Sequence, residues 1–129
     1  MKKLSLEGLK FSATKINIKN KVMTITLDRP EKKNAMNNAM MNEINYLLAY
    51  AKQEKGIRVV VFAANGDIFC AGADLSGAES ESNVPRLENS DDISLSLRHL
   101  YKPVICKIQG SVLAGALLIV SNATHAIAV

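Results

Sequence analysis

The stretch that decides the fold is residues 59–75, VVVFAANGDIFCAGADL. It begins with an apolar run typical of a buried strand, Val59 to Ala63, and reaches a turn at Asn65-Gly66. The small residues Ala71-Gly72-Ala73 follow, and Asp74 closes them. Because small side chains leave backbone N–H groups accessible, such a loop can hold a ligand against the main chain. In enzymes, this arrangement commonly stabilises a developing oxyanion.

A second strand-to-loop transition follows further along the chain. Residues 102–110, KPVICKIQG, predict another buried strand ending in a turn, and residues 111–118, SVLAGALL, predict the start of an apolar helix. Each transition alone is a weak signal, because Gly- and Ala-rich strand–turn–helix junctions occur in most α/β proteins. Together with residues 27–37, LDRPEKKNAMN, the two transitions form a specific set of three motifs.

This set of three motifs resembles the enoyl-CoA hydratase/isomerase family, also called the crotonase superfamily, from about Lys15 to Val129. The resemblance implies an α/β fold built as a crotonase-like spiral of ββα turns. Domains of that family are considerably longer than 129 residues. We therefore expect one partial spiral domain over residues 1–129, truncated before the later spiral turns and C-terminal helices. Residues 1–14 are then an N-terminal extension and residues 76–89 a flexible loop.

Hydrophobic periodicity predicts the individual elements. Alternating apolar residues predict an antiparallel hairpin turning at Lys19-Asn20-Lys21. Helical spacing predicts an amphipathic helix that ends near Gly56, and a second helix capped by Ser90 or Asp91, with Tyr101 on its apolar face. In chain order, the expected elements are strands 16–18 and 22–27, helix 37–55, strand 59–63, helix 93–101, strand 104–108, helix 115–122 and strand 125–129. This order predicts parallel strands joined by right-handed crossovers.

The resemblance also implies where the site lies. In that family two backbone amides hold the thioester oxygen, and the matching residues here are Ala73 and Gly115. A purely structural role, in which both loops merely permit close packing, is the alternative. The residues matching the coenzyme A contacts are Lys32, Lys33, Ala35, Ala71, Asp74 and Leu75. The two lysines would attract phosphate oxygens, although solvated surface lysines are nearly as good an interpretation.

The acid–base residues are where this chain departs from the family's pattern. Hydratases of the family position water with two glutamates, and the first of these positions falls on Leu118. The second would lie beyond Val129. We therefore expect weak or no hydratase activity. Isomerase-like members of the family, or other members that use a single base supplied from beyond Val129, are compatible with Leu118. The histidines, His99 and His125, carry no signal of a catalytic role, and no His, Cys, Asp or Glu cluster has metal-ligand spacing.

Composition excludes several other classes of protein. Hydrophobic residues make up 48% of the chain, which argues against disorder, and the longest apolar run, 112–120, is too short for a bilayer span. The net charge is +4, concentrated in the first 60 residues, but no nucleic-acid motif accompanies it. Cys70 and Cys106 lie in apolar segments, as reduced core cysteines of a cytoplasmic protein would.

The expected ligand is an acyl-CoA or acyl-phosphopantetheine thioester, with coenzyme A as part of the substrate and no separate cofactor. The resemblance further implies a homo-oligomer, a trimer or hexamer, and no nucleic acid or membrane partner. An alternative from another class is a non-catalytic remnant that serves as a binding or oligomerisation module.

Overall fold

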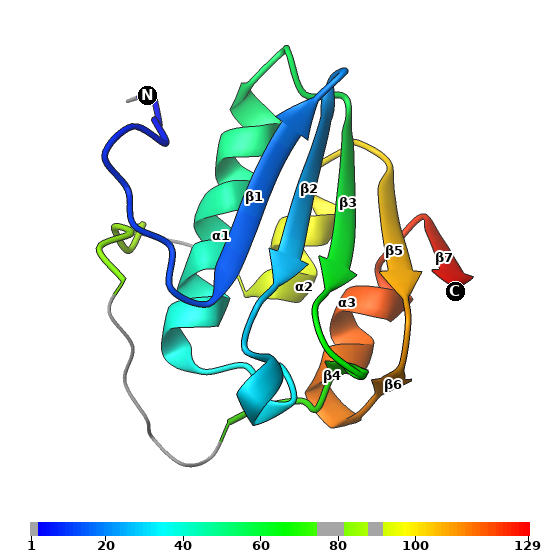
Figure 1. The fold of residues 1–129 in the computed structure, drawn as a ribbon. Helices are drawn as coiled ribbons and strands as arrows, with labels where there is room; N and C mark the ends of the chain where they lie inside the picture. Colours follow the sequence, from blue (N-terminus) through cyan, green and yellow to red (C-terminus); the bar gives the residue numbers. More distant parts are fainter. Residues whose placement is uncertain (1–2, 75–81, 88–91) are drawn as a thin grey trace.

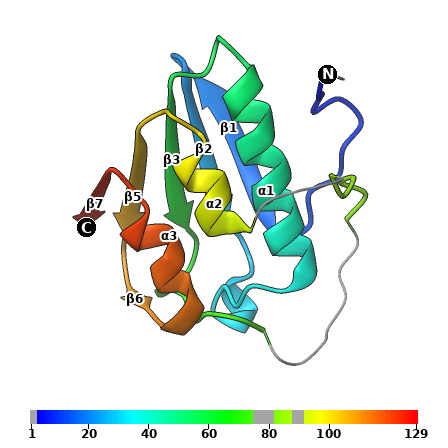
Figure 2. The ribbon, with the colours of Figure 1, turned by 180° about the vertical axis from the view of Figure 1, so that it is seen from behind.

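The computed structural model describes residues 3–74, 82–87 and 92–129. Within these ranges a five-stranded sheet forms one layer, and three α-helices form a second layer against one face of it (Figure 1). The sheet order is β1 (Thr14–Lys19), β2 (Val22–Leu27), β3 (Val59–Ala64), β5 (Val104–Ile108) and β7 (His125–Ala128). The helices are α1 (Asn38–Gln53), α2 (Ile93–Arg98) and α3 (Leu117–Ser121), seen in front of the sheet in Figure 2.

Strand pairing confirms the predicted hairpin and the predicted α/β class. β1 and β2 are antiparallel, and the turn between them places Asn20 and Lys21 at φ 52° and 65°. Two successive positive φ values are typical of the tight turns that match strand twist. The pairs β2–β3, β3–β5 and β5–β7 are all parallel, as expected of strands joined by crossover helices.

Helix α1 packs against β1 and β2 of the sheet. The side chain of Asn37 caps its first turn by accepting a hydrogen bond from Met40 N at 2.9 Å. One face of the helix is buried with strand residues in a single core, and full burial of each such side chain stabilises the fold by about 1.5–3 kcal/mol. The buried set includes Met40, Ile44, Leu47, Leu48 and Ala51 from the helix and Met23, Ile25 and Phe62 from the sheet.

The end of α1 differs from the sequence expectation. The helix stops at Gln53 with Glu54 as its C-cap, before Gly56. The ammonium group of Lys102 donates hydrogen bonds to the carbonyl oxygens of Glu54 at 2.9 Å and Ile57 at 2.7 Å, and also to Ala51 O. A cation at this position satisfies carbonyl groups that have no intrahelical partner. Burial lowers the pKa of Lys102, and the nearby charge of Glu54 partly opposes that shift.

Helix α2 corrects two predictions. Its N-cap is Asp92, whose Oδ1 accepts from Leu95 N at 2.8 Å, and not Ser90 or Asp91. Tyr101 is 81% exposed and has a φ of 56°, so it lies outside the buried face that Ile93 and Leu97 form. All helices in the described ranges are too short or too polar to cross a membrane.

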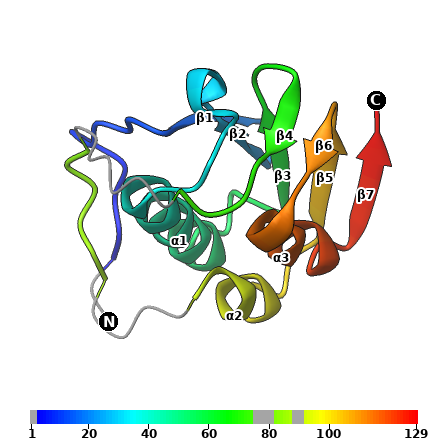
Figure 3. The ribbon, with the colours of Figure 1, turned by 90° about the horizontal axis from the view of Figure 1, so that it is seen from below.

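A second, two-stranded parallel sheet was not predicted. It pairs β4 (Ile68–Cys70) with β6 (Ser111–Val112) and lies below β3 and β5 in Figure 1, so that it is in front of them when the molecule is seen from below (Figure 3). Two 3₁₀ helices, η1 (Pro30–Lys32) and η2 (Ala114–Ala116), flank the same region. The end of the molecule that carries the small-residue loops is therefore built from short elements.

Glu43 of α1 forms hydrogen bonds that hold the segment before β1 against the helix layer. The side chain is fully buried, and its carboxylate accepts from the backbone N–H groups of Ser12, Ala13 and Thr14 at 3.0–3.1 Å. The hydroxyl of Thr14 donates to the same carboxylate at 2.8 Å. Residues 3–13 thus run along the helix layer and are held to it. They belong to the segment, residues 1–14, that we expected to be an N-terminal extension.

The segment expected to be a flexible loop, 76–89, is described only over 82–87. These residues have no helix or strand. Asn83 Nδ2 donates to Gly8 O at 3.1 Å, and Asn42 of α1 donates to Val84 O at 2.9 Å. The described part therefore contacts both the N-terminal segment and α1, and the remainder lies outside the described residues.

Replacing Glu43 by alanine tests this arrangement. Glu43→Ala leaves buried N–H groups without an acceptor, so we expect the free energy of unfolding to fall by roughly 3 kcal/mol. Urea unfolding followed by circular dichroism measures it. The exposed Glu7→Ala is the control, and it should change stability by no more than about 0.5 kcal/mol. Equal stability of the two variants would contradict the assigned role of Glu43.

Candidate functional site

Two loops far apart in the sequence run side by side at the end of the sheet. Met36 N donates to Gly72 O at 2.7 Å, and Asp74 N donates to Met36 O at 2.9 Å, which makes a parallel bridge between Met36 and Ala73. Ala71 N also donates to Lys33 O at 3.0 Å. The 71–74 loop therefore extends as a short strand along the segment that follows η1.

This bridge turns the amide of Ala73 away from Met36. Gly72 C=O and Asp74 N–H point toward Met36, and successive residues of an extended chain point to opposite sides, so Ala73 N–H points the other way. Among the residues that the structure describes, no acceptor partners the Ala73 amide. The same holds for Gly115, whose position in the first turn of η2 leaves its N–H without an intrahelical acceptor.

The loop around Gly72 lies against the start of η2. A methyl group on Gly72 would lie 3.4 Å from Gly115 N and 3.1 Å from both Ala114 Cβ and Leu113 O. Gly72 also has a φ of 94°, a conformation that side chains disfavour. A methyl group on Gly115 would lie 4.0 Å from Ala73 N. Glycine at position 72 therefore allows the two loops to approach this closely.

A cavity of about 270 Å³ lies where these loops meet the helices. Ala73 and Gly115 both line it, so the structure brings the two predicted amide donors to one cavity. Its walls are mainly apolar, and one of them is Leu118, the residue that the resemblance led us to expect at a glutamate position of hydratases. Polar lining comes from Asn45 of α1 and from Asp92 and Ser94 at the start of α2. None of these three polar residues was predicted, because helices distant in sequence supply them.

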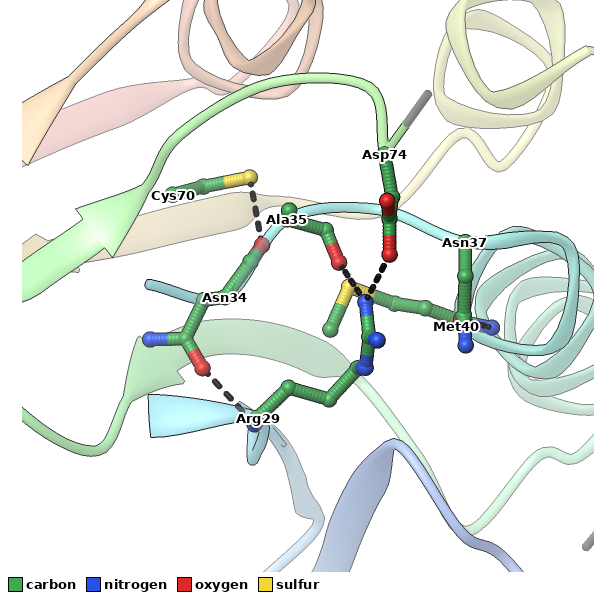
Figure 4. A network of polar contacts seen from close by, with 7 residues as sticks. All are labelled: Arg29, Asn34, Ala35, Asn37, Met40, Cys70 and Asp74. Carbon is green, nitrogen blue, oxygen red and sulfur yellow. Dashed lines mark hydrogen bonds and ion pairs between the residues drawn. The ribbon is translucent and has the colours of Figure 1, made fainter. Parts of the chain in front are cut away.

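A buried polar network supports the 71–74 loop and the segment that follows η1 (Figure 4). Arg29 Nη1 lies 3.1 Å from Asp74 Oδ2, and the two side chains are 8% and 9% exposed. The same nitrogen donates to Ala35 O. Asn34 Oδ1 accepts from Arg29 N at 2.8 Å, and Asn34 Nδ2 donates to Asn65 O at 2.8 Å and Ile68 O at 2.9 Å. The network ties the end of β2 to the β3–β4 turn and the 71–74 loop.

Sequence reasoning missed Arg29 and Asn34 as site residues. One signal was present, because Asn34 follows Lys33 and both adopt a φ of 54°, a conformation in which asparagine is enriched. The partner of Arg29 could not be read locally, since Asp74 lies 45 residues away. Asp74 was predicted to line a coenzyme A channel, and the structure pairs its carboxylate with Arg29.

The other predicted contact residues lie around the same loops. Lys32 and Lys33 are exposed, on η1 and at its C-cap, while Ala35 and Ala71 are half-buried. The hydrogen bond from Ala71 N to Lys33 O places the lysine segment next to the 71–74 loop. Leu75 lies outside the described residues.

Both cysteines are buried and unpaired, as predicted. The thiol of Cys70 donates to Asn34 O at 3.0 Å. Burial raises the pKa of Cys70, with a smaller opposing contribution from the Gly72 backbone, and burial raises the pKa of Cys106 to about 11. Neither thiol has the lowered pKa of a nucleophile. Within the described ranges, no three His, Cys, Asp or Glu side chains gather as a metal site requires.

Comparisons with known proteins identify the same family as the three sequence motifs. Residues 17–129 match the enoyl-CoA hydratase/isomerase family. The trans-2-decenoyl-[acyl-carrier-protein] isomerase of Streptococcus mutans is 33% identical over 119 residues, covering 87% of this chain and 45% of that protein. The 1,2-epoxyphenylacetyl-CoA isomerase of Escherichia coli is 34% identical over 106 residues, covering 74% of this chain and 38% of that protein.

Solved structures give the same picture of the fold. The enoyl-CoA hydratase structure from Mycobacterium smegmatis superposes with a TM-score of 0.76 and 28% identity, covering 90% of this chain and 47% of that one. The fold is thus the crotonase fold over most of the chain, as predicted. The chain spans less than half the length of the two isomerases and of this structure.

The burial of the Arg29–Asp74 pair predicts how its loss would change the free energy of unfolding. Asp74→Ala leaves a buried guanidinium without its counter-charge, so we expect the free energy of unfolding to fall by about 3–5 kcal/mol. A double-mutant cycle with Arg29→Met, measured by urea unfolding, should show strong coupling. Lys15→Met, which breaks the pair at 3.5 Å between the exposed Lys15 and the half-buried Asp28, is the control and should cost no more than about 1 kcal/mol. Additive effects of Asp74→Ala and Arg29→Met would show that the pair is not coupled.

Proposed function

Because this chain belongs to the enoyl-CoA hydratase/isomerase family, we propose that it binds an acyl thioester and stabilises its enolate oxygen with the amides of Ala73 and Gly115. The observation that carries this proposal is that both amides lack an acceptor among the described residues and line one cavity. The thioester is one of coenzyme A or phosphopantetheine. Relatives named as acting on a coenzyme A ester and on an acyl-carrier-protein ester support both carriers.

The amide pair suits this chemistry because charge develops on the carbonyl oxygen when a thioester loses an α-proton. Fixed N–H donors stabilise that charge without reorganising, and loss of one donor raises the barrier by about 3 kcal/mol. The network around Arg29 and Asn34 holds the loop that carries Ala73, while Gly72 allows η2 to approach. The donors are therefore held in place before the substrate arrives.

The carrier portion of the substrate extends toward the lysine segment. Lys32 and Lys33 are exposed cations beside the 71–74 loop, and they attract the phosphate groups of the carrier. The small side chains of Ala35 and Ala71 let the carrier pass close to the backbone. These residues supply binding, and the amide pair supplies the electrostatic contribution to the reaction.

The reaction that this cavity supports best is a proton shift without addition of water. Leu118 can neither orient nor activate a water molecule, and it lines the cavity beside Met36 and Ile119. The Streptococcus mutans relative, which is named as an isomerase of a trans-2-decenoyl thioester, supports this assignment. We therefore place the chain with the isomerase-like members of its family and expect little hydration.

A second candidate function is a binding or oligomerisation module. The four residues of β7 are exposed, and Ile127, Leu117 and Leu118 each expose about half of their surface. Exposed apolar groups on β7 and α3 favour association, which also agrees with the expected homo-oligomer. In this alternative the chain self-associates without binding a thioester.

Removing one amide tests the proposed oxyanion site. Ala73→Pro deletes the N–H that faces the cavity but keeps the bridge to Met36, which uses Gly72 O and Asp74 N. We expect affinity for butyryl-CoA, measured by calorimetry, to fall roughly 10-fold or more, because one hydrogen bond to the carbonyl is lost. Ala73→Ser keeps the amide and is the matched control. Wild-type affinity in Ala73→Pro would refute the site, and absence of binding by the wild type, together with self-association in sedimentation, would favour the second candidate.

Hydration is tested on the wild-type chain. With crotonyl-CoA at a concentration that calorimetry shows to be bound, we expect the absorbance of the conjugated thioester to remain nearly constant. The reason is that Leu118 offers no group to activate water. Efficient loss of that absorbance, with the 3-hydroxyacyl product identified by mass spectrometry, would overturn the isomerase-like assignment.

A further inference from the structure

We propose that Asp92 is the acid–base group that moves protons on the thioester held by Ala73 and Gly115. This inference rests on the proposed function and names a residue that the family motifs do not indicate. The cavity that contains the two amides has a single ionisable side chain among its described lining residues, and that side chain is Asp92. Proton transfer in this cavity therefore requires either Asp92 or a group from outside the described residues.

The position of Asp92 is fixed by hydrogen bonds on both sides of α2. Ser96 Oγ donates to Asn45 Oδ1 of α1 at 2.9 Å, and Asn122 Nδ2 donates to Ser94 Oγ at 3.0 Å. Ile93, the residue after Asp92, is buried in the core. These contacts hold the first turn of α2 at the cavity that the two loops line from the other side.

The carboxylate of Asp92 combines a fixed oxygen with an available one. Oδ1 accepts the capping hydrogen bond from Leu95 N at 2.8 Å, which holds the side chain at the helix start. Within the described part of the chain, Oδ2 has no hydrogen-bond partner. Asp92 is exposed, whereas the carboxylates of Asp74 and Glu43 are buried in structural networks. Asp92 thus has an oxygen that can take a proton.

The step balances without water or a redox cofactor. The Asp92 carboxylate removes a proton from the α-carbon, so that the C–H bond breaks and an O–H bond forms. The electron pair moves to the carbonyl oxygen, where the two amides stabilise the enolate. Return of the proton to the α-carbon gives exchange with solvent, and delivery to the γ-carbon of a 3-enoyl thioester moves the double bond to the 2-position. An apolar wall such as Leu118 is compatible with both outcomes.

Exchange of α-protons with deuterium tests this role directly. Butyryl-CoA is incubated with the purified chain in D₂O, and loss of the α-proton signal is followed by NMR. We expect Asp92→Asn to slow the exchange by about 100-fold or more while affinity for butyryl-CoA is unchanged. Asparagine and serine cap helices about as well as aspartate, so Asp92→Asn and Asp92→Ser remove the base and keep the fold. Asp67→Asn, an exposed carboxylate on the β3–β4 turn, is the control and should exchange at the wild-type rate.

The outcomes separate this inference from the proposed function. If the wild type binds butyryl-CoA through the Ala73 amide but does not catalyse exchange, or if Asp92→Asn exchanges at the wild-type rate, Asp92 is not the base and the binding site stands. If only Asp92→Ala loses exchange while Asp92→Asn and Asp92→Ser retain it, the role of Asp92 is capping, and the inference is overturned. If the wild type binds no thioester, the proposed function fails first.

Discussion

The buried pair of Arg29 and Asp74 is the interaction on which the site end of the molecule depends. It joins the second residue after β2 to the residue that follows Ala71-Gly72-Ala73, and both side chains are almost completely removed from water. Two charges in such a place stabilise a fold only when their remaining hydrogen-bonding groups are also satisfied. Here Ala35 O takes a further hydrogen bond from Arg29, and Asn34 holds the Arg29 backbone.

That support explains how an opening lined by backbone can persist at the end of a sheet. Loops rich in glycine and alanine lose much conformational entropy on ordering and gain little from their own side chains. The free energy that orders them must come from neighbours, and here it comes from Asn34, Arg29 and the core beneath α1. The residues proposed to do the chemistry are therefore few and small, and the residues that hold them are larger and buried.

Periodicity and turn chemistry predicted the elements whose signals are local. The β1–β2 hairpin, α1 and the parallel strands follow from spacing of two or 3.6 residues. Strands β4 and β6 are too short to show a period, and Asp92 could not be told from its neighbours Ser90 and Asp91 as a helix cap. Pairings that depend on tertiary contact, such as Arg29 with Asp74 or Lys102 with the end of α1, leave no local pattern. The small-residue loops predicted which two amides lie together, and helices from elsewhere in the chain supply much of the cavity that these amides line.

The bridge between Met36 and Ala73 has a consequence for how such a site can change during evolution. Because an extended chain alternates its N–H groups from side to side, insertion or deletion of one residue between Cys70 and Ala73 would turn the amide of the residue now in that position to the opposite side. No intermediate orientation exists between the two registers. A change in the length of this loop would therefore either keep or remove the amide that faces the cavity. Substitutions of the residues around the cavity can instead change its shape and polarity in small steps.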